Sequence, residues 1–131
     1  MIKKIHKSLD EWRTILPPDI YAITRGRGTE PAFNNAYWDK KDEGFYECSN
    51  CHLTLFSSKH KFDSGTGWPS FYQPYKEENV NYRDDYSSNM IRQEAECARC
   101  GSHLGHIFQD GPKPSGLRFC MNSAALIFVK K

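Results

Sequence analysis

Two stretches with the same spacing, Cys48-Ser-Asn-Cys51 and Cys97-Ala-Arg-Cys100, decide the expected fold of this chain. The two sulfurs of a Cys-x-x-Cys pair can converge on one metal ion, each about 2.3 Å from it. Two such pairs form a closed tetrahedral site of four sulfurs, which selects zinc or, less often, iron. The segment between the pairs is far longer than the roughly 15–20 residues of a zinc finger. We therefore predict a structural zinc ion that joins distant parts of one fold.

Two other interpretations of the cysteine pairs are separate redox motifs and buried thiols that pair without a metal. Two independent pairs in a chain without an export signal favour zinc. Gly101 suits the tight turn that such a pair needs. His52 is a rival ligand, but four sulfurs already complete the shell, so we expect it to be exposed. The fifth cysteine, Cys120, is left alone, and a solitary cysteine is usually a small buried apolar residue.

Composition excludes several classes of protein. The chain has 131 residues, of which 38% are hydrophobic and 26% charged, and its net charge is +2. This length fits one domain, and so small a net charge gives no drive toward nucleic acid. No apolar run is long enough for a membrane span, and the basic start lacks the apolar stretch of a secretory signal. We expect a cytoplasmic protein without nucleic-acid or membrane partners.

Hydrophobic patterning predicts short helices followed by β-structure. Ser8-Leu-Asp-Glu11 has the form of a capping box, with Leu9, Trp12 and Leu16 on one helical stripe. A second short helix is expected over Asp19–Arg25, and the segment Gly28–Trp38 is expected to be irregular. Short runs bounded by turn residues then predict antiparallel strands over Phe45–Cys48, Leu53–Phe56, Met90–Cys97, Gly105–Phe108, Leu117–Asn122 and Ala125–Val129. The stretch between Lys59 and Asn89 has little periodicity and is expected to be a long loop.

The strand around Cys120 carries a reactive group on one face. Alternation places Leu117, Phe119 and Met121 toward the core and Arg118, Cys120 and Asn122 on the opposite face. The thiol then lies between a cation and an amide, and a nearby arginine could lower its pKa from about 8.5. This strand alone leaves open whether Cys120 is a nucleophile or a packed cysteine.

Two histidines follow the second cysteine pair in Ser102-His-Leu-Gly-His106. Their spacing does not place both on one side of an ideal strand, but Gly105 permits a bend. His106, Phe108 and Asp110 then alternate on one face. Imidazole gives and takes protons near pH 7, so this segment is a candidate source of a general acid. A second metal site and hydrogen-bonded support are the alternatives.

The segment Asp63-Ser-Gly-Thr-Gly-Trp-Pro-Ser-Phe71 is expected to display an aromatic side chain. Gly65 and Gly67 allow backbone angles that other residues resist, and Pro69 stiffens the exit. An indole presented in this way suits a methyl or thioether group. The alternative is that Trp68 fills the core.

Together these motifs resemble the B-type methionine sulfoxide reductases, a family that reduces the R epimer of methionine sulfoxide. The resemblance covers the two cysteine pairs together with Gly28–Phe33, Tyr37–Asp39, Lys61–Phe71, His103–His106 and Arg118–Leu126. It implies a mainly β fold of two antiparallel sheets packed together, with short N-terminal helices and zinc at the edge. It also implies a single catalytic domain over residues 1–131, with residues 1–27 as a helical segment packed on it.

The resemblance also implies roles for the site residues. Cys120 would attack the sulfoxide sulfur, and His103 would be the leading candidate to protonate the oxygen. The remaining roles would be the polar pocket and its water (His106, Asp110, Asn122), thiolate stabilisation (Arg118) and contact with the substrate (Trp68, Phe108). The products would be methionine and a sulfenic acid on Cys120.

This sequence departs from the family pattern at Thr66, where many relatives carry a resolving cysteine. Since the other four cysteines are assigned to zinc, no partner remains for an internal disulfide. The expected substrates are oxidised proteins or peptides that carry methionine R-sulfoxide. Thioredoxin, glutaredoxin or a small thiol is then expected to reduce the sulfenic acid.

Two other functions compete with this interpretation. A zinc-stapled binding module would not need the nucleophile Cys120 between Arg118 and Asn122. A hydrolase with a Cys/His site would turn over thioesters or amides and would not explain Trp68.

Overall fold

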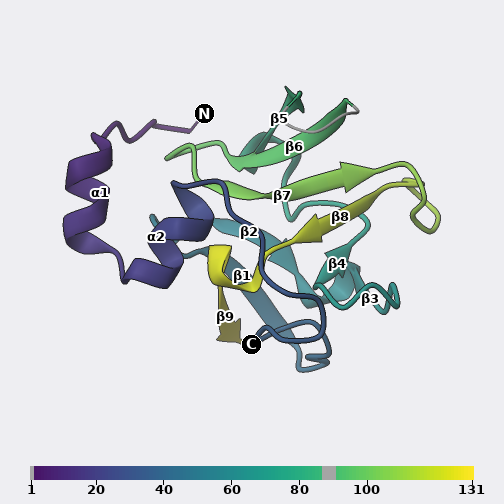
Figure 1. Cartoon of the computed structure of the whole chain (residues 1–131). Helices are drawn as coiled ribbons and strands as arrows, with labels where there is room; N and C mark the ends of the chain where they lie inside the picture. The colour runs from purple at the N-terminus through teal and green to yellow at the C-terminus, as the bar shows by residue number, and fades with distance from the viewer. Residues whose placement is uncertain (1, 87–90) are drawn as a thin grey trace.

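The computed structural model describes residues 2–86 and 91–131. Two short helices begin the chain, and strands follow from residue 44 onward (Figure 1). The helices are α1 (Leu9–Ile15) and α2 (Pro18–Thr24). The strands of the described part are β1 (Gly44–Cys48), β2 (Thr54–Ser57), β3 (Lys61–Phe62), β4 (Ser70–Phe71), β5 (Val80–Asp85), β6 (Arg92–Cys97), β7 (His103–Phe108), β8 (Arg118–Met121) and β9 (Leu126–Lys130). Short 3₁₀ turns cover Ser58–His60, Glu77–Asn79 and Ser123–Ala125.

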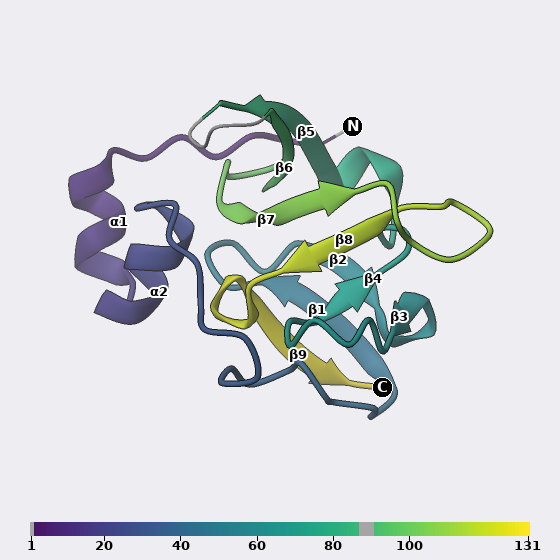
Figure 2. The same cartoon turned by 45° about the vertical axis from the view of Figure 1, so that its right-hand side comes forward.

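These strands form two antiparallel sheets, which confirms the predicted fold class. One sheet has the order β2-β1-β9, and the other has the order β3-β4-β8-β7-β6-β5. Figure 2 shows the larger sheet running from β5 to β3, with the smaller sheet packed beside its lower half. Strand β8 lies between β7 and β4, so its side chains are flanked on both sides.

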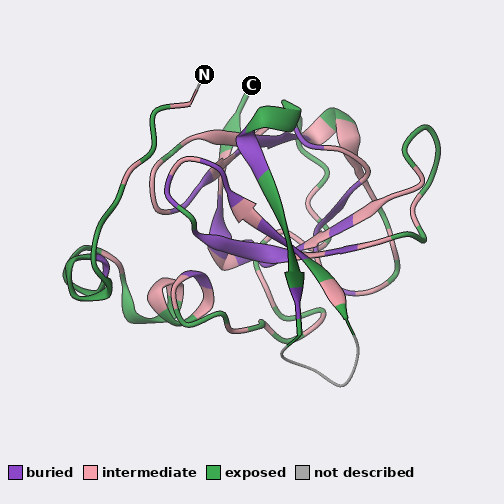
Figure 3. Ribbon diagram, turned by 90° about the horizontal axis from the view of Figure 1, so that it is seen from above, coloured by how far each residue is buried: buried purple, intermediate pink, exposed green. Residues whose placement is uncertain are grey.

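Aromatic rings hold the two sheets together. Tyr46 of the smaller sheet contacts Phe71 of the larger sheet with ring centroids 5.2 Å apart. Phe56 stacks on Phe71 at 4.4 Å and meets Phe119 edge-on at 5.8 Å. All four rings are fully buried, and Figure 3 shows such buried segments running through the middle of the molecule. The core face of β8 is thereby fixed, because Phe119 cannot leave this cluster without opening a large cavity.

The N-terminal helices are anchored to both cysteine pairs. The capping box of Ser8 and Glu11 is present, but Leu9 is 58% exposed while Trp12 is buried. The Arg25 guanidinium lies over the Trp12 ring at 4.0 Å and donates hydrogen bonds to Asn50 Oδ1 and to the Cys100 carbonyl. Neither of these seven-residue helices is long enough to cross a bilayer, and no other helix of the described chain is either.

The expected loop between Lys59 and Asn89 was wrong for its described part. It contains β3, β4 and β5, whereas Asn89 lies outside the described residues, as does Met90 at the expected start of β6. Strands β3 and β4 have only two residues each, which is too short for any periodicity. Strand β5 lies at a sheet edge, and its middle residues are exposed and polar, so it lacks the apolar alternation of a half-buried strand.

Candidate active site and metal centre

The two cysteine pairs have the same local backbone geometry. Strand β1 ends at Cys48 and strand β6 ends at Cys97, so one pair belongs to each sheet. The N–H of His52 donates to the Cys48 carbonyl at 2.8 Å, and the N–H of Gly101 donates to the Cys97 carbonyl at 2.9 Å. Both donors have positive φ, 66° at His52 and 79° at Gly101. His52 points outward with 66% of its side chain exposed, as expected for a residue that is not a ligand.

The four sulfurs converge on one point. All lie within 4.8 Å of one another, and the Sγ atoms are 3.6 Å apart for Cys48 and Cys100 and 3.5 Å apart for Cys51 and Cys97. Sulfurs bound tetrahedrally to one ion at about 2.3 Å lie about 3.8 Å from each other. These cysteines therefore fit a metal ion and join the ends of β1 and β6. Cys120 is not part of the cluster.

The strand register places Cys120 beside a histidine and a serine. In the antiparallel ladders Cys120 is directly opposite His106 of β7 and Ser70 of β4, so the three side chains share one face of the larger sheet. A Cβ at Gly105 would lie 2.1 Å from the Cys120 carbonyl oxygen. Any larger residue at this position would clash with β8, so the glycine is what allows β7 and β8 to lie this close.

The expected bend in the histidine segment is a β-bulge. The register between β6 and β7 shifts so that Gly105 opposes Ala95 and His103 opposes Glu96, which leaves Leu104 as the extra residue. His103 and His106 consequently lie on the same face, with ring centroids 5.4 Å apart. Both histidines thus share the face that carries Cys120.

The two histidines have different surroundings. His103 is 2% exposed, and its Nδ1 bonds the buried carboxylate of Glu94. His106 lines the pocket beside Cys120, and its Nε2 lies 2.7 Å from Asp85 Oδ2. Of the two, it is His106 that reaches the pocket, although His103 was the leading candidate for the acid.

A pocket of about 190 Å³ opens over Cys120. Six of the eight residues predicted to act beside a substrate line it, namely Trp68, His106, Phe108, Arg118, Cys120 and Asn122. His103 and Asp110 do not. The other lining residues are Thr29, Thr66, Arg92 and Gly105. The pocket therefore unites the loop before β4 with β6, β7 and β8.

Trp68 forms a wall of this pocket and is only half-buried. Gly65 and Gly67 both have positive φ, as expected for a shaped loop. The indole Nε1–H donates to the Glu30 carbonyl at 2.8 Å. The Glu30 carboxylate in turn accepts from the N–H groups of Ser123 and Ala124, just after β8. These bonds hold the indole over the pocket. Trp68 therefore does not fill the core, which was the alternative interpretation.

The charge of Arg118 is shared with a carboxylate. Its Nε and one terminal nitrogen bond the two oxygens of Asp110 at 2.9 and 3.2 Å, and its guanidinium lies 4.5 Å from the Phe108 ring centre. Asp110 itself is exposed. Asp110 therefore compensates part of the Arg118 charge, and this weakens the effect of the arginine on the thiol.

Burial opposes ionisation at both reactive groups. It raises the pKa of the Cys120 thiol above that of an ordinary cysteine, although the charge of Arg118 and hydrogen bonds from Arg118 and Thr66 act in the other direction. The expected effect of Arg118, which is to lower the Cys120 pKa, is therefore present, but burial outweighs it. Burial likewise lowers the pKa of His106, and the bond to Asp85 offsets this only in part. Near neutral pH the structure favours a neutral thiol beside a neutral imidazole.

Sequence reasoning missed the charged residues behind the histidines. Asp85 binds His106, Glu94 binds His103, and Arg27 donates to Glu94 at 2.7 Å. A signal existed in β6, where Arg92, Glu94 and Glu96 alternate and so lie on one face. Asp85 gave no such signal in the sequence. Its contact with His106 depends on where β5 lies, at the edge of the larger sheet beside β6.

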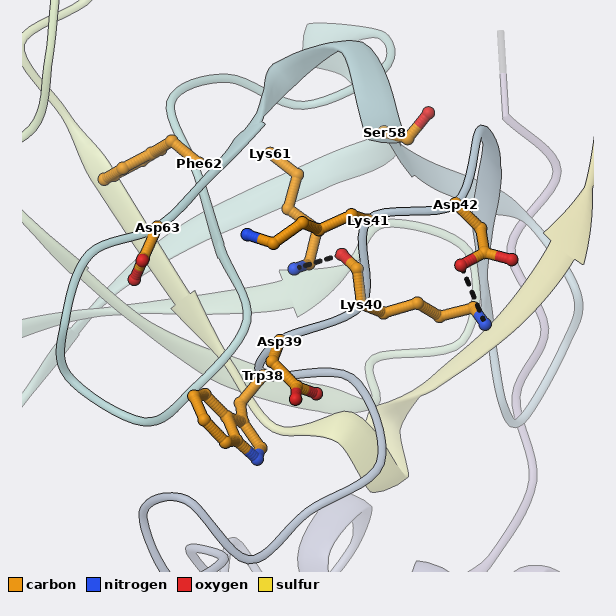
Figure 4. Close-up of a pocket in the computed structure, with 9 residues that line it drawn as sticks. All are labelled: Trp38, Asp39, Lys40, Lys41, Asp42, Ser58, Lys61, Phe62 and Asp63. Atoms are coloured by element: carbon orange, nitrogen blue, oxygen red, sulfur yellow. Dashed lines mark hydrogen bonds and ion pairs between the residues drawn. The ribbon is translucent and has the colours of Figure 1, made fainter.

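A second pocket, of about 180 Å³, lies between the segment 38–42 and β3 (Figure 4). It is lined by lysines and aspartates together with Trp38, Ser58 and Phe62. Lys61 Nζ donates to the Lys40 carbonyl at 2.8 Å, and Lys40 pairs with Asp42 at 3.7 Å. Among the described residues, those that line it include neither a cysteine nor a histidine.

Comparison with known proteins agrees with this geometry. Residues 16–130 match the SelR domain. Proteins named peptide methionine sulfoxide reductase MsrB are similar over nearly the whole chain. That of Thiobacillus denitrificans is 54% identical over 92% of this chain and 92% of its own length, and that of Leptospira interrogans is 49% identical over 98% of each. That of Acinetobacter baylyi is 51% identical over 94% of this chain and 88% of its own length.

The chain therefore belongs to the SelR domain family. Within that family it is a member of the MsrB group, and so an oxidoreductase. The resemblance inferred from the sequence motifs is thereby confirmed at the level of the family.

The pairing of Arg118 with Asp110 makes a prediction about the thiol. In Asp110→Asn the negative charge that raises the Cys120 pKa is lost and Arg118 is released, so this pKa falls. Alkylation of Cys120 by iodoacetamide at pH 7, followed by peptide mass spectrometry, is expected to be about two- to fivefold faster. Asp10→Asn on the exposed side of α1 is the control and should leave the rate unchanged. An unchanged or slower rate in Asp110→Asn would contradict the assignment.

Proposed function

We propose that this protein reduces methionine R-sulfoxide in oxidised proteins and peptides to methionine. The observation that carries the proposal is the cross-strand pair of Cys120 and His106 in a pocket walled by Trp68. The names of the relatives, peptide methionine sulfoxide reductase, support the same substrate class. The preference for the R epimer follows from the resemblance of the motifs to that family.

In the proposed reaction the Cys120 sulfur attacks the sulfoxide sulfur. The sulfoxide oxygen is transferred to Cys120, so that methionine and a cysteine sulfenic acid are formed. The methionine sulfur gains two electrons and the cysteine sulfur loses two. No organic cofactor is required, since the thiol supplies the electrons.

His106 is the proposed carrier of the proton. With Nε2–H donated to the Asp85 carboxylate, Nδ1 holds a lone pair that can take the proton of Cys120. The imidazolium so formed is stabilised by Asp85 and can deliver its proton to the sulfoxide oxygen. This order of events agrees with the pKa directions, because the resting thiol and imidazole are both neutral. His103 is then proposed as a buried support, held by Glu94.

The remaining pocket residues are proposed to orient the substrate. The Trp68 indole and the Phe108 ring offer apolar surfaces for the methyl group. Asn122 accepts a hydrogen bond from the Glu30 N–H and donates to the Leu104 carbonyl, so it positions both the Trp68 support and β7. Arg118 faces the anion that develops on Cys120, and Asp110 orients Arg118.

An external thiol is proposed to complete the cycle. Thr66 lines the pocket where a resolving cysteine would stand, and the other four cysteines form the metal cluster. One reductant thiol displaces water from the sulfenic acid to form a mixed disulfide, and a second thiol releases Cys120. Thioredoxin, glutaredoxin or a small thiol would supply these electrons. The cytoplasm, the predicted location, is a thiol-rich compartment.

The metal is proposed to be zinc in a structural role. A shell of four thiolates is closed and leaves no position for a substrate. Cys48, Cys51, Cys97 and Cys100 would hold the ion and fix the ends of β1 and β6. His103 comes soon after this cluster in the chain, so a fixed cluster also restricts β7.

Single turnover of separated R and S sulfoxides tests the proposed reaction. Without reductant, one equivalent of the R epimer is expected to be reduced per chain, with a sulfenic acid at Cys120 trapped and detected by mass spectrometry. Cys120→Ser should lose this turnover while it keeps the fold. Reduction of the S epimer alone, or a stoichiometric internal disulfide at Cys120, would contradict the mechanism. A binding module would reduce neither epimer.

Exchange of each histidine separates their roles. His106→Asn removes the proposed proton carrier, so single-turnover reduction is expected to slow by about 10²–10⁴-fold. His103→Asn should lower the free energy of unfolding, because Glu94 loses a buried partner, and should slow the reaction less. Rates at saturating sulfoxide and urea unfolding give both quantities. A greater loss of rate in His103→Asn would reverse the assignment.

Elemental analysis of the purified chain tests the metal assignment. One zinc ion per chain is expected, with loss of the ion and a lower Tm in Cys97→Ala, because β1 and β6 are then no longer joined. Cys120→Ser is the matched control and should retain the ion. Iron in place of zinc, or the same Tm with and without a chelator, would contradict the assignment.

A further inference from the structure

Three hydroxyl groups lead in a row to Cys120 from the side opposite the histidines. Ser70 Oγ on β4 donates to Ser64 Oγ at 2.9 Å, and Ser64 Oγ lies 2.7 Å from Thr66 Oγ1. Thr66 lines the same pocket as Cys120, and hydrogen bonding from its side chain is among the effects that lower the Cys120 pKa. The row starts at Ser70, the residue opposite Cys120 in the β4–β8 ladder. The hydroxyls therefore form a short arc around the thiol.

The hydrogen bonds of the row allow one direction in which Thr66 can donate to the sulfur. A hydroxyl has one hydrogen to donate and two lone pairs that accept. Ser64 Oγ accepts from the Thr66 N–H at 3.3 Å, whereas the single hydrogen of Ser70 Oγ can be donated to Ser64 Oγ or to the Trp68 carbonyl. When Ser70 donates to Ser64, both lone pairs of Ser64 Oγ are used and its own hydrogen points to Thr66 Oγ1. The Thr66 hydrogen is then available to the Cys120 sulfur, which as an anion can only accept.

The backbone of the loop keeps Thr66 in place. Gly65 and Gly67 on either side of it both have positive φ. A Cβ at Gly67 would lie 2.6 Å from the Phe33 nitrogen, and the Gly67 carbonyl accepts from the Phe33 N–H and from Asn35 Nδ2. The Gly65 N–H donates to Asp63 Oδ1. The Thr66 hydroxyl is thus presented by a loop that is bonded at both ends.

We propose that Thr66 is a positioning residue that donates a hydrogen bond to the Cys120 sulfur when Ser70 and Ser64 donate along the row toward it. It stabilises the sulfur anion while the sulfoxide is attacked. The proposal rests on the proposed function only in so far as Cys120 is the nucleophile. It assigns a role to the side chain that stands where many relatives carry a resolving cysteine.

The charged groups that face Cys120 make such a donor useful. Arg118 is paired with Asp110, His106 is bonded to Asp85, and Arg92 of β6 lies 3.5 Å from Asp85. Each of these three side chains is therefore paired with a carboxylate. The Thr66 oxygen contacts Ser64 Oγ, and the row of hydroxyls itself brings no negative charge toward the sulfur.

The row of hydroxyls acts as a hydrogen-bond donor and cannot be a proton wire. Its far end, Ser70 Oγ, also lies 3.1 Å from the Trp68 carbonyl, which neither releases nor takes up protons near neutral pH. Serine and threonine do not titrate in this range either. The effect of Thr66 is therefore electrostatic, while His106 remains the proposed carrier of the proton.

The test compares Thr66→Val, which keeps the shape without the hydroxyl, with Thr66→Ser, which keeps the hydroxyl. The rate of Cys120 alkylation by iodoacetamide is measured against pH, so no sulfoxide is needed. Thr66→Val is expected to be about tenfold slower near neutral pH and to reach the wild-type plateau at high pH. Thr66→Ser should stay close to wild type. Thr14→Val, a threonine of α1 remote from the pocket, is the control for the exchange.

A second variant tests the direction of the bonds. Ser64→Ala frees the Thr66 oxygen from its donor, so the profile should shift in the same direction as in Thr66→Val, by a smaller amount. A wild-type profile in Thr66→Val, or a loss in Thr66→Ser as large as in Thr66→Val, would overturn the proposal. If these shifts occur but wild-type protein reduces neither sulfoxide epimer, the proposed function fails while the role of Thr66 stands.

Discussion

The register of β8 between β7 and β4 is the constraint on which the site depends. It places Cys120 opposite His106 on one side and opposite Ser70 on the other. Because side chains alternate along a strand, a slip by one residue would turn Cys120 into the core and bring Phe119 to the pocket. Two features oppose such a slip. Phe119 is locked in the aromatic cluster between the sheets, and Gly105 leaves room for the Cys120 carbonyl.

The larger sheet separates two tasks between its faces. One face carries Phe71, Phe119 and Met121 and packs on the smaller sheet. The other face carries the pocket, and there burial works against charge. It raises the pKa of Cys120 and lowers that of His106, while carboxylates such as Asp85 compensate the neighbouring cations. The cysteine cluster joins the sheets at the end of β6, which restricts the strand whose Glu94 bonds His103.

Much of the fold and of the site could be predicted because the signals are local. The spacing of each cysteine pair, the capping box at Ser8 and the alternation around Cys120 involve residues a few positions apart. The strands that were missed lack such a signal, because β3 and β4 are too short and β5 is exposed along most of its length. The choice between His103 and His106 was also beyond local patterns. It depends on which histidine lies opposite Cys120, and only the pairing of β7 with β8 shows that this is His106.

Residue identities and short spacings were enough to indicate the family, the four-sulfur cluster and the lone thiol. The folded chain was needed to show which histidine reaches the pocket, that Asp85 and Glu94 hold the two imidazoles, and that Arg118 is shared with Asp110. It also showed that burial outweighs Arg118 and raises the Cys120 pKa. The reason is that burial and charge pairing are sums over neighbours that lie far apart in the chain, and strand register decides which neighbours those are.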